Sequence, residues 1–282
     1  MLPKTLKAAK TVRADKRNIN CHRVVKCKKA FVYASLGLRR CVCGCFFRRD
    51  YMQDKKKHGY FTKTEIALWI GSVIFITVSF LLFDGQNYLT LAASLIGVSS
   101  LIFNAKGNPT GQVLMIVFSL VYGYISYGCA YYGEMITFLG MTLPMSVFSL
   151  ISWLKNPYKG NRAQVKVSTV GRYETIFMLL LTAAVTGAFY FILDALGTAS
   201  LIPSTVSLAT SFAAAYLTFR RSPFFALGYA ANDVILIVLW IIASLSDPKY
   251  ISVVVCFFAF LFNDVYGYIN WQRMKKKQAL DS

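Results

Sequence analysis

Eight mainly apolar stretches, each about 20 residues long, follow one another along this 282-residue chain. A helix of that length spans the hydrocarbon core of a bilayer, which is about 30 Å thick. Hydrophobic residues make up 56% of the chain, too large a share for a soluble domain of this size. The sequence therefore predicts an all-α polytopic membrane protein, with spans at about 65–83, 87–104, 112–131, 134–154, 173–194, 201–219, 223–245 and 249–271.

Charge is distributed unequally between the two sides of these spans. The chain holds 31 Lys and Arg residues against 12 Asp and Glu, and basic residues collect in cytoplasmic loops close to membrane helices. The segments before the first span and after the last are basic, whereas the outer connections carry single acids at Asp84, Glu134, Asp194 and Asp247. We therefore expect both termini to be cytoplasmic. The sequence shows no aromatic-rich nucleic-acid-binding fold, so nucleic acid is not an expected partner.

Residues 1–63 form a basic tail unlike the rest of the chain. Five cysteines lie there beside His22, but their spacing fits no familiar zinc pattern: Cys21, Cys27, Cys41, Cys43 and Cys45. We therefore predict a disordered cytoplasmic tail, and we expect neither a metal nor a cofactor. Met52 opens an ordinary short lead into the first span, so a second interpretation is that residues 1–51 extend from an upstream start codon.

Weak internal repeats organise the spans. At an offset of 113 residues Ser94 matches Ser207 and Leu95 matches Leu208, and at an offset of 118 the run Ile151–Leu154 resembles Ile269–Gln272 through its Ile and Trp. Two three-helix units at 87–154 and 200–272 follow from these matches. Because an even number of spans separates their starts, the two units run in the same direction. Parallel repeats of this kind are a known transporter plan, with the substrate bound between the repeats.

The remaining segments complete a 1+3+1+3 arrangement. We expect an additional N-terminal helix at 64–84 and a linking helix at 173–196 between the two bundles. A basic cytoplasmic loop at 155–172 and a cytoplasmic C-terminus at 273–282 are also expected. Trp69, Trp153 and Trp271 lie near predicted helix ends, and we interpret them as residues of the interfacial aromatic belt.

Two acidic residues lie well inside predicted spans. Asp233 and Asp264 each follow an Asn and precede a Val, and each is followed seven residues later by a Trp. A charged side chain at the centre of a membrane helix costs about 2.5–3.5 kcal/mol on insertion scales, so such a residue usually faces the interior and serves a function. The alternative is a structural pair with a neighbouring polar group.

Polar and aromatic side chains recur at helical spacing around these acids, and together they would suit a small planar polar solute. Asn, Ser and Gly at the same positions are also explained by helix packing and interhelical hydrogen bonds. The candidate substrate-binding residues are Asn232, Asp233, Asn263, Asp264, Ser119, Tyr122, Tyr266, Gln112, Ser146 and Trp240.

Several motifs give residues 64–275 a resemblance to the PnuC family of nicotinamide riboside transporters. They are YISYGCAYYGEM at 124–135, Pro144-Met145 followed by Trp153, WLKNPYKGN at 153–161 and the run Gly267–Trp271. The chain departs from the family at Ser146, where many members carry Gln, and at Phe225 and Gly228, where many carry a Trp pair.

The resemblance implies two three-helix bundles flanking a linking helix, similar to the SWEET sugar transporters. It also implies a trimer in a bacterial inner membrane, and uptake of nicotinamide riboside by facilitated diffusion, with trapping by intracellular phosphorylation. Relatives in the wider family are thought to carry thiamine or deoxyribonucleosides, so a closely similar nucleoside-like vitamin precursor is the second choice of substrate.

Two other interpretations of the paired aspartates remain open. A buried Asp can carry a proton, which would suit a proton-coupled nucleoside or thiamine symporter. An intramembrane aspartyl protease also needs two carboxyl groups that share a proton. The sequence lacks the Gly-x-Gly-Asp motif of such proteases, and each Asp follows an Asn. We therefore predict that the protein is not an enzyme.

Overall fold

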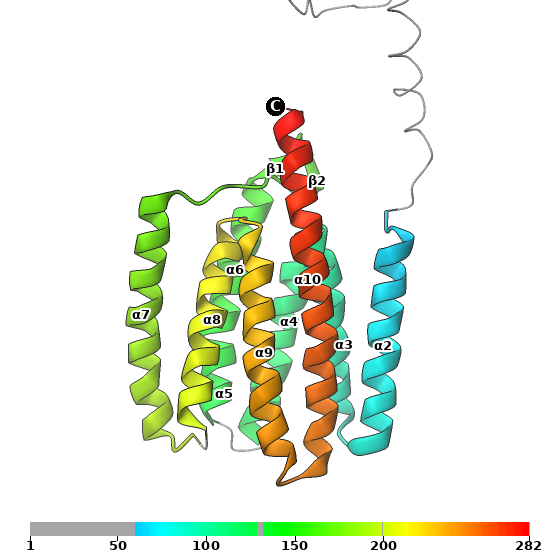
Figure 1. The fold of residues 1–282 in the computed structure, drawn as a ribbon, viewed down its shortest axis with the longest axis vertical. Coiled ribbons are helices and arrows are strands. Elements are labelled where there is room, and N and C mark those ends of the chain that lie inside the picture. The colour runs from blue at the N-terminus through cyan, green and yellow to red at the C-terminus, as the bar shows by residue number, and fades with distance from the viewer. Residues whose placement is uncertain (1–59, 129–131, 199, 282) are drawn as a thin grey trace, which may run out of the picture. The chain divides into compact units, whose positions relative to one another are not determined.

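The computed structural model describes residues 60–128, 132–198 and 200–281. Residues 1–59 of the predicted disordered tail, with its cysteines and the proposed start extension, lie outside them, whereas Thr62 caps the first described helix and Lys63 begins it. Helices dominate this part of the chain (Figure 1). Eight helical segments in it are long and apolar enough to cross a membrane. The predicted all-α polytopic fold is therefore confirmed.

The order of elements follows the 1+3+1+3 plan. The additional helix α2 (Lys63–Phe83) comes first, and α7 (Arg172–Ala195) links the two bundles. The first bundle consists of α3 (Tyr88–Ala105), α4 (Thr110–Gly128) and a third span made of α5 (Tyr132–Ile136), the π-helix η1 (Thr137–Thr142) and α6 (Leu143–Lys155). The second bundle consists of α8 (Leu201–Phe219), α9 (Phe224–Ser244) and, after a short 3₁₀ turn η2 (Pro248–Tyr250), α10 (Ile251–Leu280).

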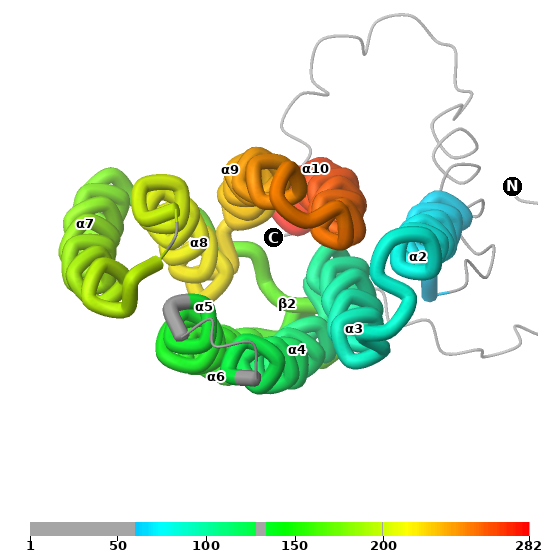
Figure 2. Tube along the Cα trace, turned by 90° about the horizontal axis from the view of Figure 1, so that it is seen from below, coloured from blue at the N-terminus to red at the C-terminus, as the bar shows by residue number. Residues whose placement is uncertain are grey.

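The three spans of each bundle together form a closed ring when they are viewed along their axes (Figure 2). Within each bundle neighbouring helices pack together, and the third span of each bundle also packs on the first helix of the other, α6 on α8 and α10 on α3. Helix α7 packs on α8, while α2 packs on α3 and α10. The linking helix and the additional helix therefore lie outside the ring.

Pro144 changes the third span of the first bundle. A proline has no N–H to donate, and its ring would collide with the carbonyl four residues earlier in a regular α-helix. The helix widens just before it, so that the Leu143 N–H bonds to the Phe138 carbonyl, five residues back. The span that the sequence predicts at 134–154 is therefore an α-helix with a π-helical segment inside it.

The two repeats are joined by matching hydrogen bonds at the end of the ring where α3 and α8 finish. The Trp153 indole donates to the Thr218 carbonyl at 2.8 Å, and the Trp271 indole donates to the Asn104 carbonyl, also at 2.8 Å. The residue before each Trp donates to the next carbonyl of the same helix. Ser152 Oγ donates to the Phe219 carbonyl and Asn270 Nδ2 to the Ala105 carbonyl, both at 2.8 Å.

These bonds give the sequence repeat a physical meaning. The last carbonyls of an α-helix have no partner inside the helix. Here the last two of α3 and of α8 accept hydrogen bonds from the third span of the opposite repeat, and the Asn104 and Thr218 carbonyls also accept from the turn N–H groups of Gly107 and Arg221. Trp153 and Trp271 are almost fully buried, with 1% and 0% of their surface exposed. Their interpretation as interfacial belt residues is therefore wrong, whereas Trp69 is exposed.

A short hairpin covers the same end of the ring. Strands β1 (Pro157–Tyr158) and β2 (Asn161–Val165) pair antiparallel within the predicted basic loop. Val165 is fully buried, and its N–H donates to the Gly107 carbonyl at 2.9 Å. Gln278 donates to the Val165 carbonyl at 3.1 Å and accepts from the Val167 N–H at 2.8 Å.

Helix α10 is longer than the sequence predicts. Its predicted end lies at about residue 272, but the helix continues through the basic segment to Leu280. The reason is that Met274 and Gln278 on this extension pack against β2 and the residues after it. The predicted C-terminal tail is therefore mostly helix.

The reciprocal indole bonds predict matched stability losses. Trp153→Phe and Trp271→Phe keep an aromatic ring but remove a buried hydrogen bond between the two repeats, which contributes about 0.5–1.5 kcal/mol. Each variant in detergent should therefore unfold several degrees below the parent protein in a thermal-shift assay, by about 2–4 °C per kcal/mol. Trp69→Phe is the control, because its indole is 42% exposed and bonds only to Ser99 Oγ at 3.1 Å. Equal shifts in all three variants would contradict the account.

Candidate functional site

A cavity of about 180 Å³ lies inside the ring, between the two bundles. Its walls come from α3, α4, η1, α8, α9 and α10, and from the connection between α7 and α8. Towards the reciprocal Trp bonds, the cavity extends as far as the helical turns that carry Ala215 and Tyr229. At the opposite end, where α7 joins α8, it is lined by Trp240 and Thr198. The cavity therefore occupies the half of the bundle away from the reciprocal Trp bonds.

The other half of the bundle is filled by side chains. Trp153, Trp271 and Phe225 form an aromatic cluster with Ala226, Met274 and the hairpin residue Val165. The two indole rings lie 5.4 Å apart, and Phe225 meets the Trp271 ring edge-on at 4.9 Å. We call this set the Trp cluster. It separates the cavity from the hairpin end of the ring.

One wall of the cavity is polar. Asn232 Oδ1 accepts hydrogen bonds from Ser207 Oγ at 2.8 Å and Thr210 Oγ1 at 3.1 Å. These two bonds fix the amide plane and leave the Nδ2 group of Asn232 as a donor for a ligand. Asp233 and Asp264 line the same cavity, and their carboxyl groups lie within hydrogen-bonding reach of each other.

The opposite wall and the wide end of the cavity are aromatic. The Tyr122 and Phe138 rings lie 4.5 Å apart, and Phe118 meets Phe138 edge-on at 5.8 Å. Trp240 on α9 faces the cavity from the second bundle. Aromatic faces and a few fixed polar groups are a common lining for a flat, polar small molecule.

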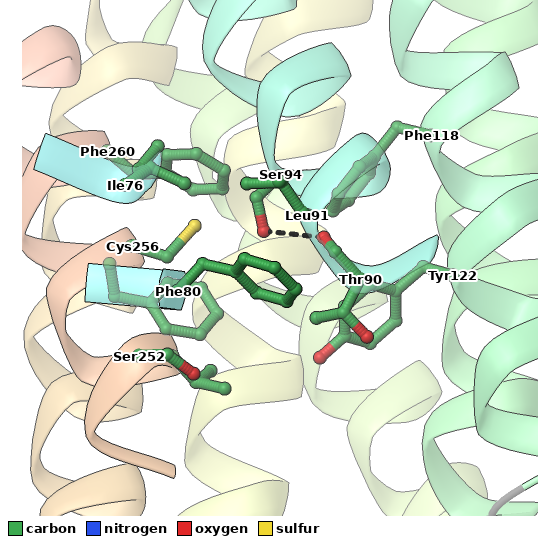
Figure 3. A pocket seen from close by; sticks show the side chains of 12 residues that line it. Ile76, Phe80, Thr90, Leu91, Ser94, Phe118, Tyr122, Ser252, Cys256 and Phe260 are labelled. Atoms are coloured by element: carbon green, nitrogen blue, oxygen red, sulfur yellow. Dashed lines mark hydrogen bonds between the residues drawn. The ribbon is translucent and has the colours of Figure 1, made fainter. Parts of the chain in front are cut away.

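A second, much smaller hollow adjoins this lining. It holds about 30 Å³ between α2, α3, α4 and α10, and Phe118, Tyr122 and Phe260 contribute to both spaces (Figure 3). Ser94 on its wall is occupied by a bond to the Thr90 carbonyl at 2.9 Å. A space of this size has room for about one water molecule, so the larger cavity is the candidate site.

Five of the ten candidate residues line the large cavity: Asn232, Asp233, Asp264, Tyr122 and Trp240. The other five do not belong to its described lining. Gln112 bonds to Asn104 Oδ1 at 2.8 Å, Ser119 bonds to the Met115 carbonyl at 2.8 Å, and Ser146 is buried within α6. These three side chains take part in helix packing.

Asn263 and Tyr266 lie on the side of α10 that faces α2. Asn263 Nδ2 donates to Ser72 Oγ at 2.9 Å, and the Tyr266 hydroxyl donates to Glu65 Oε1 at 3.1 Å. Glu65 is itself held by Lys106 at 2.8 Å. Neighbouring residues of a helix point about 100° apart, so Asn263 faces the additional helix while Asp264 faces the cavity. The polar stripe that contains Asn263 and Tyr266 therefore attaches α2 to the ring.

Several residues that line the cavity were not predicted from the sequence. Ser204, Ser207 and Ser211 present three hydroxyl-bearing residues to the cavity from α8. Their i, i+3, i+7 spacing is a helical stripe that could have been recognised. Phe138 and Glu134 had no such signal, because the π-helical segment shifts which side chains of this span face inward.

The fold and the cavity define a class of protein: a polytopic membrane protein with two parallel three-helix repeats around a central polar cavity, which is the plan of a solute transporter. The profile of a family described as nicotinamide mononucleotide transporter matches residues 87–273. The chain belongs to this family.

Individual relatives support the same assignment. The chain is 26% identical over 218 residues to the nicotinamide riboside transporter PnuC of Neisseria mucosa, covering 76% of this chain and 82% of that protein. It is 23% identical over 214 residues to the protein of the same name from Haemophilus influenzae, covering 75% and 91%. The crystal structure of the vitamin B3 transporter PnuC has the same fold, with a TM-score of 0.68 at 23% identity, covering 78% of this chain and 95% of that one.

The two Asn-Asp pairs give a direct test of these placements. Asn263→Ala should destabilise the protein by about 1–3 kcal/mol, because it leaves the buried Ser72 hydroxyl without its donor, while ligand affinity should stay unchanged. Asn232→Ala should weaken binding of nicotinamide riboside about tenfold or more, since it removes a cavity donor. Thermal shift and calorimetry on both variants would check this. A loss of affinity in Asn263→Ala equal to that in Asn232→Ala would contradict it.

Proposed function

We propose that this protein transports nicotinamide riboside, or a closely similar nucleoside-like vitamin precursor, by facilitated diffusion. The observation that carries the proposal is the cavity between the two repeats, which sets the Asn232 amide and two carboxyl groups against aromatic rings. Ribose hydroxyls can donate to the carboxyl oxygens and accept from the Asn232 amide, while the flat base lies against aromatic faces. The names of the relatives agree with this chemistry.

The charge of the lining favours a riboside over a mononucleotide. Glu134, Asp233 and Asp264 contribute acids to the cavity, and none of its described lining residues is Lys, Arg or His. Phosphate groups are usually bound by Arg, Lys or backbone N–H groups at helix N-termini. A phosphate in this cavity would instead meet carboxyl groups, so we propose that the phosphorylated compound named in the family description is not the substrate here.

Phe225 and Gly228, which replace the Trp pair of many relatives, are compatible with a substrate that differs somewhat from nicotinamide riboside. Phe225 packs in the Trp cluster, and a Cβ at Gly228 would approach the Ala214 Cβ to 2.9 Å. The two positions that carry a Trp pair in many relatives are therefore used here for close helix packing. Base recognition in our proposal depends on Tyr122, Phe138 and Trp240 instead.

The orientation in the membrane follows from charge. The end that carries the Trp cluster also carries Lys159, Arg162 and the basic extension of α10, so we propose that it faces the cytoplasm. The described state would then be closed to the inside, with the cavity in the outer half.

Cysteine probes at positions 85 and 195 should react from outside, and probes at 106 and 221 only after permeabilisation; the reverse pattern would invert the proposed orientation. The trimer implied by the resemblance remains an expectation.

A proton-coupled symporter is the second candidate function, favoured by the close approach of Asp233 and Asp264. A transported proton needs a buried acid that is exposed alternately to the two sides of the membrane. Asp233 on α9 and Asp264 on α10 lie about half-way along the ring. We prefer a uniporter without enzymatic activity, because the same pair can serve as a ligand for ribose hydroxyls.

Binding by the purified protein tests the proposal. Calorimetry should show binding of nicotinamide riboside, with the mononucleotide at least about tenfold weaker because of charge repulsion. Tighter binding of the mononucleotide would contradict the charge argument, and binding of neither compound would contradict the proposed function. Uptake into proteoliposomes should persist after the proton gradient and membrane potential are collapsed. Uptake that stops would establish the symporter instead.

A further inference from the structure

Two carboxyl groups of neighbouring helices meet inside the membrane half-way along the ring. Asp233 comes from α9 and Asp264 from α10, and they are 4% and 5% exposed. Their side chains are close enough to share a hydrogen bond. Both line the cavity, and Asp233 Oδ2 has no hydrogen-bond partner among the described residues. A proton shared between the two carboxyl groups would give this buried oxygen a partner.

The surroundings offer this pair no positive charge. The other titratable groups near it are Tyr229 and Cys256, on the same two helices, and Glu134 at the wider end of the cavity lining. No described lining residue is basic.

Cations on the elements packed against α9 and α10 are engaged elsewhere. Lys106 pairs with Glu65, Arg220 with Glu174 and Lys249 with Asp247, each at or beyond a helix end. The remaining basic residues of α2 and α10 are Lys63, the first residue of α2, and four residues of α10 that follow Trp271: Arg273, Lys275, Lys276 and Lys277.

Two carboxylates in contact inside a buried site do not both ionise, because the second charge meets both the repulsion of the first and the cost of leaving water. A shared proton removes one charge and supplies the hydrogen bond between the two groups. One negative charge is left. An isolated charge in the membrane interior is costly, and no basic side chain of the described lining offsets it.

We propose that Asp233 and Asp264 act as one anion: they share a single proton, and their remaining charge selects a substrate whose ring is singly positive. This inference rests on the proposed function and adds its charge requirement. Nicotinamide riboside has such a ring, since its pyridine nitrogen is bonded to the sugar and carries a positive charge. That nitrogen is bonded to C1′ of the ribose, and the neighbouring carbon, C2′, bears a hydroxyl group. A carboxyl oxygen that accepts a hydrogen bond from the 2′-hydroxyl therefore lies close to the positive charge.

The aromatic lining supports the same selection. The faces of Tyr and Trp rings attract cations through their quadrupole, most strongly when water is excluded. Tyr122 and Trp240 both line the cavity. A positive ring between these faces and near the carboxyl pair would gain from both, whereas a neutral ring of the same shape would gain only from stacking.

The test compares nicotinamide riboside with its reduced form, dihydronicotinamide riboside, which keeps the sugar and the amide but has an uncharged ring. The parent protein should bind the cation at least about tenfold more tightly. Asp233→Asn and Asp264→Asn should each keep that preference even where affinity falls, because the new amide replaces the shared proton and the other carboxylate keeps the charge. The double variant should lose most of it and keep only the part that the aromatic faces contribute.

Asp247→Asn is the matched control, because it removes a carboxylate from the α9–α10 connection without changing the charge of the cavity. Its preference for the cation should equal that of the parent protein. A double variant that prefers the cation as strongly as the parent protein does, or a parent protein that binds both ribosides equally, would overturn the inference while leaving the proposed function in place. Binding of neither riboside by the parent protein would contradict the proposed function itself.

A measurement on the parent protein alone guards against a double variant that does not fold. Calorimetry of nicotinamide riboside binding in buffers of different ionisation enthalpy counts the protons exchanged. A pair that holds one proton before and after binding predicts an exchange close to zero. Uptake of a proton would mean that both groups were ionised in the free protein. Release of one would mean that the free pair holds two protons or that the ligand-bound pair holds none; either result would overturn the proposal of a single proton held throughout.

Discussion

The structure depends on how the ends of two helices are satisfied. The final carbonyls of α3 and α8 lie inside a membrane protein, where backbone polar groups need hydrogen-bond partners. Each pair of carbonyls is met by a polar residue and a Trp from the other repeat, Ser152-Trp153 or Asn270-Trp271. This exchange holds the repeats together without any covalent link across the ring, and it brings both indoles to the centre of one end.

Closure of that end decides where a substrate can lie. The Trp cluster, the hairpin residue Val165 and the extension of α10 fill the half of the ring beside the reciprocal bonds. The other half keeps a cavity whose polar groups lie near its inner end. Transport requires that the closed and open halves exchange roles. The same four hydrogen bonds join the repeats and lie beside the closed end.

The sequence predicted the spans, the repeats and the acids, but only half of the site. Hydrophobic length fixes eight crossings without any knowledge of packing, and the recurring Asn-Asp-Val triplets marked functional helices. What the triplets could not show is direction: adjacent side chains diverge by about 100°, so Asp264 reached the cavity while Asn263 reached Ser72. The Trp residues were misread for a related reason, because position near a helix end suits both an interfacial residue and a buried cap. Only the partner helix distinguishes these, and partners are set by tertiary packing.

An experimental structure with nicotinamide riboside bound would test the central claim most directly. The account predicts the ligand between the two repeats, with its ribose at Asn232 and the Asp233–Asp264 pair and its ring among Tyr122, Phe138 and Trp240. The Trp cluster should be intact in the outward-facing state. A ligand bound instead between α2 and α10, against Asn263 and Tyr266, would contradict the account, because the additional helix would then form part of the substrate site.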